Sequence, residues 1–86
     1  MTSPTRRPGI IETDLGSELI LLDPDTQQMF SLNPSGRLIW KLLGDMPLDD
    51  IIGCVVGEFE VDAEQAARDA HTLLARLQAA GLVSPA

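Results

Sequence analysis

The 86-residue chain is poor in the side chains from which catalytic and metal sites are built: it has one cysteine, one histidine and no tyrosine. A lone cysteine, Cys54, excludes an intramolecular disulfide and indicates a reducing compartment, so we expect the protein in the cytoplasm. Cys54 and His71 fall on different predicted helices, where Cys54 is expected to be a small structural residue and His71 a helix-flank residue. No Cys/His pair or zinc ligand set remains. The sequence therefore predicts a binding domain rather than an enzyme, with no metal and no cofactor.

Basic residues are also scarce, because six Lys and Arg stand against 13 Asp and Glu and the net charge is −7. Seven acids and no base fall between Asp45 and Glu64. Such a surface repels a phosphate backbone, so the composition disfavours nucleic acid as a partner. The acidic run is either a solvated face or a docking patch for a basic partner.

Long apolar runs are missing, which predicts no membrane span and no signal peptide. Residues 1–9 contain two prolines and few apolar side chains, and this composition predicts a flexible N-terminal arm. Residues 10–83 are expected to form a single small domain, followed by a tail over 84–86. A domain of this size buries roughly 60–65% of the surface of its unfolded chain, so we expect modest stability.

Three segments have the pattern of strands, over residues 10–14, 18–23 and 27–32. The second is apolar at nearly every position, which is typical of a strand covered on both faces. Asp23-Pro24-Asp25-Thr26 has the residues of a type I turn and connects it to the third strand. The third strand alternates in polarity, with Gln28, Phe30 and Leu32 on one face and Gln27, Met29 and Ser31 on the other. We predict that this third strand is a sheet edge that another peptide joins.

A first helix is predicted over residues 34–43. Asn33 is suited to cap it, because its side-chain oxygen can accept a free amide of the first turn, and Pro34 has no amide hydrogen to satisfy. Gly44 then provides the left-handed end of the helix. Trp40 is expected to pack in the core or at its rim, with direct contact to a ligand as the alternative.

Two further helices follow. The second, over residues 48–59, contains two glycines that either permit close helix approach or leave the helix locally unstable. The third begins after Asp62, which together with Gln65 matches a capping box. It ends at Gly81 in a left-handed cap.

Several motifs of this chain belong together: Leu21-Leu22-Asp23-Pro24, Phe30-Ser31-Leu32-Asn33-Pro34-Ser35-Gly36, Ile39-Trp40, Leu43, Asp69 and Leu73-Leu74-x-x-Leu77-x-x-x-Gly81-Leu82. In combination they resemble the PqqD-like family. The resemblance covers residues 10–83, and the Leu-Asn-Pro-x-Gly-x-x-x-Trp segment is fairly specific. It implies an α+β fold with a three-stranded antiparallel sheet followed by three helices, related to a winged helix-turn-helix. Pro47 departs from the family, which usually has a Thr or Ser cap there.

Many members of this family recognise ribosomally made precursor peptides (RiPPs), and the resemblance implies the same role here. The leader segment of a precursor would pair with the third strand and pack against the third helix. The implied peptide-binding residues are Gln27, Gln28, Met29, Phe30, Ser31, Leu32, Ala66, Ala67, Asp69, Ala70, His71, Leu73 and Leu74. The alanines either leave room for leader side chains or let the helix pack closely on the sheet. Asp69 accepts a hydrogen bond from the leader or has a structural role.

The resemblance also implies partners. A free-standing member would deliver its precursor to separate enzymes, a leader peptidase and a macrocyclase, as in lasso peptide biosynthesis. The alternative within the family is a peptide chaperone for a radical SAM enzyme in quinone cofactor biosynthesis. A winged-helix DNA-binding role is disfavoured, because the third helix offers only Arg68 and Arg76. An oligomerisation module, in which the third strand pairs with its own copy, is a third class, and we expect a monomer or a weak dimer.

Overall fold

The computed structural model describes residues 4–84, which fold into the α+β arrangement implied by the family resemblance. The elements follow one another as β1 (Thr5–Arg6), β2 (Ile11–Asp14), β3 (Leu19–Asp23), β4 (Gln28–Leu32), α1 (Pro34–Leu42), α2 (Leu48–Phe59), α3 (Ala63–Ala79) and β5 (Val83–Ser84). Three antiparallel strands precede three helices, as predicted. Among the described residues, no helix is long and apolar enough to cross a membrane.

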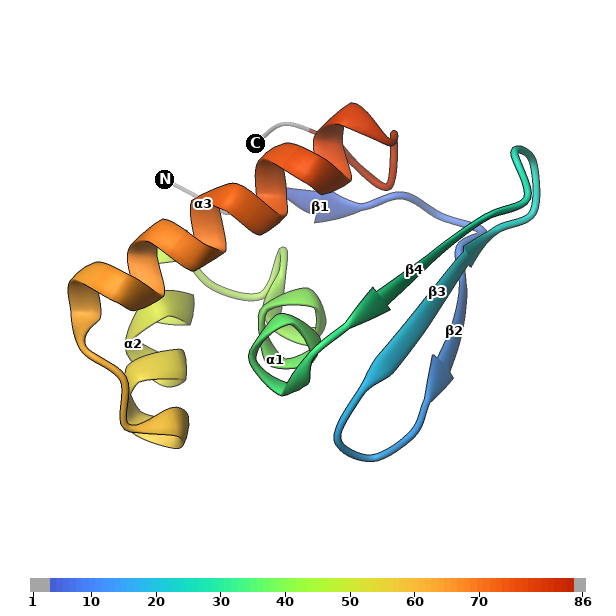
Figure 1. The fold of residues 1–86 in the computed structure, drawn as a ribbon. Helices are drawn as coiled ribbons and strands as arrows, with labels where there is room; N and C mark the ends of the chain where they lie inside the picture. The colour runs from blue at the N-terminus through green and yellow to red at the C-terminus, as the bar shows by residue number, and fades with distance from the viewer. Residues whose placement is uncertain (1–3, 85–86) are drawn as a thin grey trace.

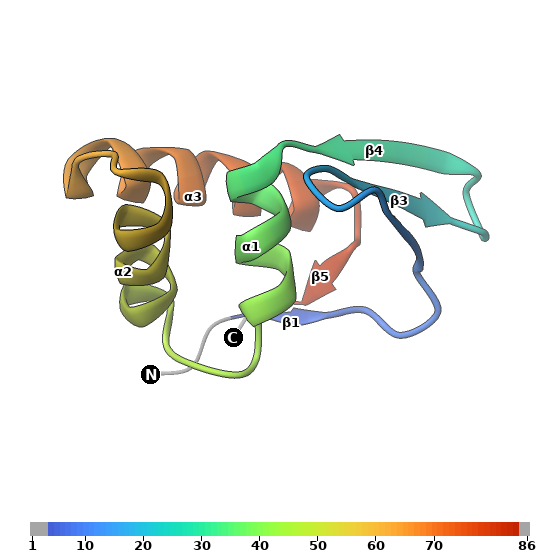
Figure 2. The same ribbon diagram turned by 90° about the horizontal axis from the view of Figure 1, so that it is seen from below.

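The main sheet has the order β2-β3-β4, so β4 lies at one edge. Leu19 pairs with Leu32 and Leu21 pairs with Phe30, which places these four side chains on the same face of the sheet. Figures 1 and 2 show the three helices gathered on one side of this sheet. The prediction that the second strand is covered on both faces is therefore wrong. Its alternate residues are only partly buried, because no helix packs on the outer face.

Helix α1 lies at the centre of the fold and contacts β3, β4, α2 and α3. Its buried side chains include Ile39 and Trp40, and Leu43 directly follows it in the same core. Trp40 is fully buried, which confirms its expected packing role. Its indole N–H has no hydrogen-bond partner among the described residues. The core is otherwise aliphatic, as the composition requires.

Local signals account for where the helices begin and end. The Asn33 side chain accepts a hydrogen bond from the backbone N–H of Gly36 at 2.8 Å, which caps α1 as predicted. Asp62 caps α3 by accepting from the backbone N–H of Gln65, also at 2.8 Å. The reciprocal half of the expected capping box is not formed, because the Gln65 amide donates to Asp69 instead. At the far end Gly81 adopts a left-handed conformation with φ of 77° and closes the helix as predicted.

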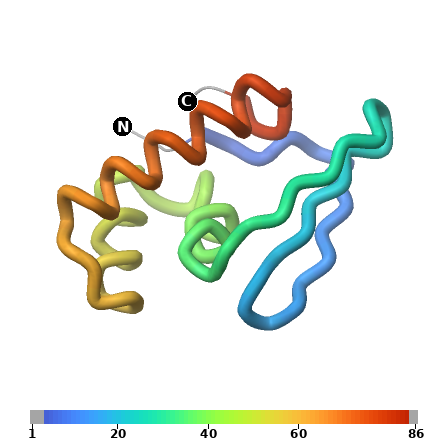
Figure 3. Tube along the Cα trace, viewed as in Figure 1, coloured from blue at the N-terminus to red at the C-terminus, as the bar shows by residue number. Residues whose placement is uncertain are grey.

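The N-terminal segment is more ordered than its composition predicts. Thr5 pairs with Ser84 and Arg6 with Val83, so β1 and β5 form a second, two-stranded sheet. In Figure 3 the blue start of the described chain runs beside its red end. The Arg6 guanidinium also donates to the backbone carbonyls of Trp40 and Lys41, at 3.1 Å each. We predicted a flexible arm over residues 1–9 and a tail over 84–86. Residues 5–6 and 84 instead lie in paired strands, so the prediction is corrected at these positions. Residues 1–3 and 85–86 lie outside the described part.

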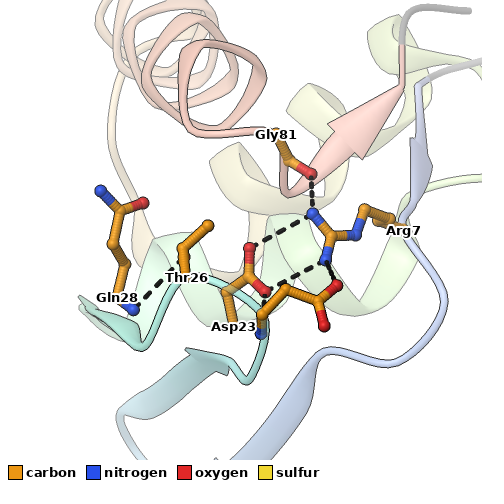
Figure 4. Close-up of polar contacts among 6 residues, drawn as sticks. Arg7, Asp23, Thr26, Gln28 and Gly81 are labelled. Carbon is orange, nitrogen blue, oxygen red and sulfur yellow. Dashed lines mark hydrogen bonds and ion pairs between the residues drawn. The ribbon is translucent and has the colours of Figure 1, made fainter.

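An ion-pair cluster fixes the same segment to the rest of the fold (Figure 4). Arg7 donates to both carboxylate oxygens of Asp23, at 3.0 and 3.2 Å, and to Asp25 at 2.9 Å. It also donates to the Gly81 carbonyl at 3.3 Å. Asp23 is fully buried at the end of β3. Burial raises the pKa of Asp23, but the Asp25 backbone N–H and the Arg7 charge outweigh it and hold that pKa below its usual value.

Candidate functional site

Strand β4 presents a free edge. It pairs with β3 on one side, and no other strand among residues 4–84 lies on its other side. The backbone N–H and C=O groups that point outward from an edge strand can pair with an additional strand. The structure thus confirms the predicted edge. The prediction included Gln27 in this strand. Gln27 has a φ of 62° and belongs to the turn before β4, so the strand begins one residue later than predicted.

The side chains of β4 separate into two faces, as the alternating pattern predicts. Leu32 is buried and Phe30 is partly buried on the face toward the helices. Met29 and Ser31 lie on the opposite face, and Met29 is 68% exposed. Gln28 is exposed at the start of the strand. A peptide that joined this edge would therefore extend an apolar inner face.

A groove of about 330 Å³ lies beside this edge, between the end of β4, the start of α1 and one face of α3. Its walls are Ser31, Leu32, Asn33, Ser35, Gly36, Ile39, Asp69, Thr72, Leu73 and Arg76. The four residues from α3 follow the helical spacing of one face. We call this cavity the edge groove. It has an apolar floor at Leu32, Ile39 and Leu73 and polar groups around it.

The edge groove contains only some of the predicted helix residues. Asp69 and Leu73 line it, whereas Ala67 and His71 do not, and His71 is exposed. Ala66, Ala70 and Leu74 are buried in the core, with exposed fractions of 2%, 0% and 5%. The burial of Ala66 and Ala70 favours the interpretation that these alanines let α3 pack closely.

Six residues of the edge groove were not predicted. Four of them come from the start of α1 and the residue before it: Asn33, Ser35, Gly36 and Ile39. The other two, Thr72 and Arg76, come from α3. They lie three and seven residues after Asp69, so both share its face of α3. Helical spacing counted from Asp69 is the signal that would have found them. The prediction followed the small and apolar side chains instead, and these define the neighbouring face that packs into the core.

A second pocket of about 190 Å³ continues from the edge groove. The two share Asn33, Ser35, Ile39 and Asp69. The added walls are mostly apolar and come from the start of α1, from α2 and α3, and from the loop between α2 and α3: Pro34, Val55, Phe59, Val61 and Ala66. A side chain that leaves the edge groove at this end would enter an apolar pocket. The start of α1, fixed by its Asn33 cap, forms the boundary between the two.

The described residues contain no candidate metal site. No group of three or more His, Cys, Asp and Glu is placed to hold a metal ion within residues 4–84. Cys54 is exposed on α2, so the expectation that it packs as a structural residue is wrong. Asp69 accepts a hydrogen bond from the Gln65 amide at 2.9 Å and remains exposed. The side chains that line the edge groove offer hydrogen bonds, apolar contact and the charges of Asp69 and Arg76.

Fold and site together define a small α+β domain with an open sheet edge beside a helix-lined groove, an arrangement to which an extended peptide can add a strand. The chain belongs to the PqqD family, because the family model described as "Coenzyme PQQ synthesis protein D (PqqD)" matches residues 18–83. It is also similar to a solved structure of TbiB1 in complex with the TbiA(beta) leader peptide, with a TM-score of 0.83 and 25% sequence identity. That similarity covers 93% of this chain and 94% of TbiB1. No curated protein matches the chain in sequence.

Proposed function

We propose that this domain binds the leader segment of a ribosomally made precursor peptide by strand addition to β4. The observation that carries the proposal is the free edge of β4 with the edge groove beside it. The similarity to TbiB1, which was solved with a leader peptide, supports the same use of this fold. Membership of the PqqD family supports a binding partner of enzymes rather than an enzyme.

Strand addition suits a protein that must hold a peptide without modifying it. Backbone hydrogen bonds along Gln28–Leu32 give affinity that depends little on sequence, and alternate side chains select the leader through pockets. In this domain the edge groove and the second pocket would receive those side chains. A paired segment of five residues with two such anchors is compatible with micromolar to nanomolar affinity.

The contact surface we propose contains all predicted residues that lie in β4 but only some of those predicted on α3. Gln28, Met29, Phe30, Ser31 and Leu32 provide the edge, and Asp69 and Leu73 face the groove. Ala66 contributes through the second pocket. Ala67, Ala70, His71 and Leu74 would act indirectly, since none of them lines either cavity.

We further propose that the bound precursor is passed to separate enzymes in the cytoplasm, a leader peptidase and a macrocyclase of lasso peptide biosynthesis. The family model's own description favours the second candidate, a role beside a radical SAM enzyme in quinone cofactor biosynthesis. The neighbouring reading frames discriminate between them. A short precursor frame beside a transglutaminase-like protease and an asparagine-synthetase-like cyclase would support the first, and a radical SAM frame would support the second.

The test uses hydrogen exchange with a synthetic peptide that corresponds to the leader of the neighbouring precursor frame. We expect the outward-facing amides of β4 to gain protection when the peptide is added, because they acquire hydrogen-bond partners. Protection confined to another surface, or none at saturating peptide, would contradict strand addition. Sedimentation distinguishes self-pairing of the edge, in which case a dimer would persist when peptide is added.

A pair of variants separates binding from folding. We expect Phe30→Ala, on the partly buried inner face of β4, to weaken peptide binding in calorimetry while circular dichroism changes little. Leu77→Ala, at a core position that is 1% exposed, should mainly unfold the domain, with a loss of about 2–5 kcal/mol. Equal loss of fold and binding in both variants would count against this division of roles.

A further inference from the structure

Most basic side chains of this domain have an acceptor within the fold. All six Lys and Arg lie among the described residues. Five of them have a carboxylate or carbonyl acceptor: Arg6 on α1 carbonyls, Arg7 on Asp23 and Asp25, Arg37 and Lys41 on Asp14, and Arg68 on Glu64. Arg76 is the exception, because within residues 4–84 it has neither an ion pair nor a side-chain hydrogen bond.

Arg76 is also the basic residue that lines the edge groove. It follows Leu73 of the groove floor by three residues and Asp69 by seven, all on one face of α3. Seven residues of helix rise by about 10.5 Å, a distance that about three residues of an extended peptide would cover. The groove therefore presents a carboxylate at one end, apolar side chains between, and a free guanidinium at the other end.

We propose that Arg76 selects leaders that carry an Asp or Glu beside an apolar anchor. This inference rests on the strand-addition function proposed above. A guanidinium offers five N–H donors in a fork that matches a carboxylate, and no acid among residues 4–84 is paired with Arg76. The carboxylate of Asp69 repels an acid at its own end and so favours one register of the guest. The net charge of −7 repels acidic peptides elsewhere on the surface, which makes Arg76 the position where an acid is accepted.

The experiment begins with a displayed library of random dodecapeptides selected on the wild-type domain. We expect the enriched peptides to share an Asp or Glu at a fixed distance from an apolar residue. An enriched peptide is then made with its acid, with the matching amide and with Lys in place of the acid. Each form is titrated against the wild type, Arg76→Gln, Arg76→Glu and Arg68→Glu. The last is the matched control, because Arg68 lies on the same helix, is exposed and does not line the groove.

For the acidic peptide we expect Arg76→Gln to weaken binding about fivefold and Arg76→Glu about tenfold or more, while Arg68→Glu changes it less than about twofold. The Lys peptide should recover affinity for Arg76→Glu, because the charges are then exchanged. The wild-type affinity should fall with added salt more steeply than that of Arg76→Gln. Arg76 is exposed, and thermal melts of each variant establish that the fold is retained.

Two results overturn the inference and leave the proposed function standing. One is a set of bound peptides that protect the β4 amides but show no acidic preference. The other is an equal effect of Arg76→Glu and Arg68→Glu, which would indicate only the overall charge. If no peptide, from the library or from the neighbouring precursor frame, protects the β4 amides, the proposed function and this inference both fail.

Discussion

Replacing Gly36 with alanine is expected to destabilise the domain, although alanine is the better helix former. Gly36 is buried in the first turn of α1 and lines the edge groove. A methyl group placed there would lie 3.2 Å from Asn33 Oδ1, 3.4 Å from Leu32 Cβ and 3.5 Å from Leu73 Cδ2. The contact with Asn33 is the tight one, and that oxygen caps the helix by accepting from the Gly36 N–H at 2.8 Å.

The magnitude follows from two opposing terms. Alanine in place of glycine within a helix gains about 0.5–1 kcal/mol. Displacing the Asn33 oxygen weakens a cap worth about 0.5–2 kcal/mol, and Leu32 and Leu73 leave little room for the methyl group to shift the other way. We expect Gly36→Ala to lose about 0.5 kcal/mol net, the difference between the midpoints of these two ranges. The added methyl group should also narrow the groove and weaken peptide binding.

Gly53→Ala is the matched control. Gly53 lies inside α2, is exposed, and has no atom within 4 Å of the position of an added methyl group. No steric clash offsets the higher helix propensity of alanine, so the free energy of unfolding of this variant should rise by about 0.5–1 kcal/mol. Urea denaturation of both variants gives the comparison. If Gly36→Ala proves as stable as Gly53→Ala, the steric argument for the glycine of the Leu-Asn-Pro-x-Gly motif is refuted.

Two further predictions concern the ion pairs. Hydrogen bonds from Arg37 and Lys41 hold the pKa of Asp14 well below its usual value. The contribution of these ion pairs to the free energy of unfolding is therefore complete above about pH 4, and it is lost as the pH falls through the lowered pKa of the folded state. The urea midpoint should drop on acidification below pH 4, and Asp14→Asn should flatten that slope; an unchanged slope would exclude this cause. Arg7→Gln should release β1, seen as faster exchange of the amide at position 7, which donates to the Leu82 carbonyl at 2.9 Å. Retained protection would mean that the strand pairing suffices without the ion pair.

The sequence predicted the elements whose causes are local. Asn33, Asp62 and Gly81 each act on backbone groups within a few residues, and each is found at the helix end where its chemistry places it. The pairing of β1 with β5 joins residues nearly eighty positions apart through two-residue strands. No periodicity can indicate such short strands, so this part of the fold was missed.

At the candidate site, too, the locally determined features were predicted and those that depend on tertiary packing were missed. Alternation in residues 27–32 predicted an edge strand, and the structure agrees apart from Gln27. On α3, however, periodicity identifies the stripe that is buried and does not identify which exposed face lies beside the sheet edge. That depends on how α3 is set against β4, which is a tertiary property. The prediction therefore followed the alanines and missed Thr72 and Arg76, which line the groove together with Asp69 and Leu73.

One side chain links the β3–β4 hairpin to the C-terminal end of α3. Arg7 binds Asp23, where β3 ends and the turn toward β4 begins, and the Gly81 carbonyl just beyond the end of α3. The bidentate pair with a fully buried carboxylate fixes the first anchor, and the left-handed Gly81 presents its carbonyl as the second. We expect this link to limit movement of α3 relative to β4, so that less of the binding free energy is spent on conformational entropy when a peptide binds. Arg7, which directly follows β1, would thus support the binding site without lining the cavity.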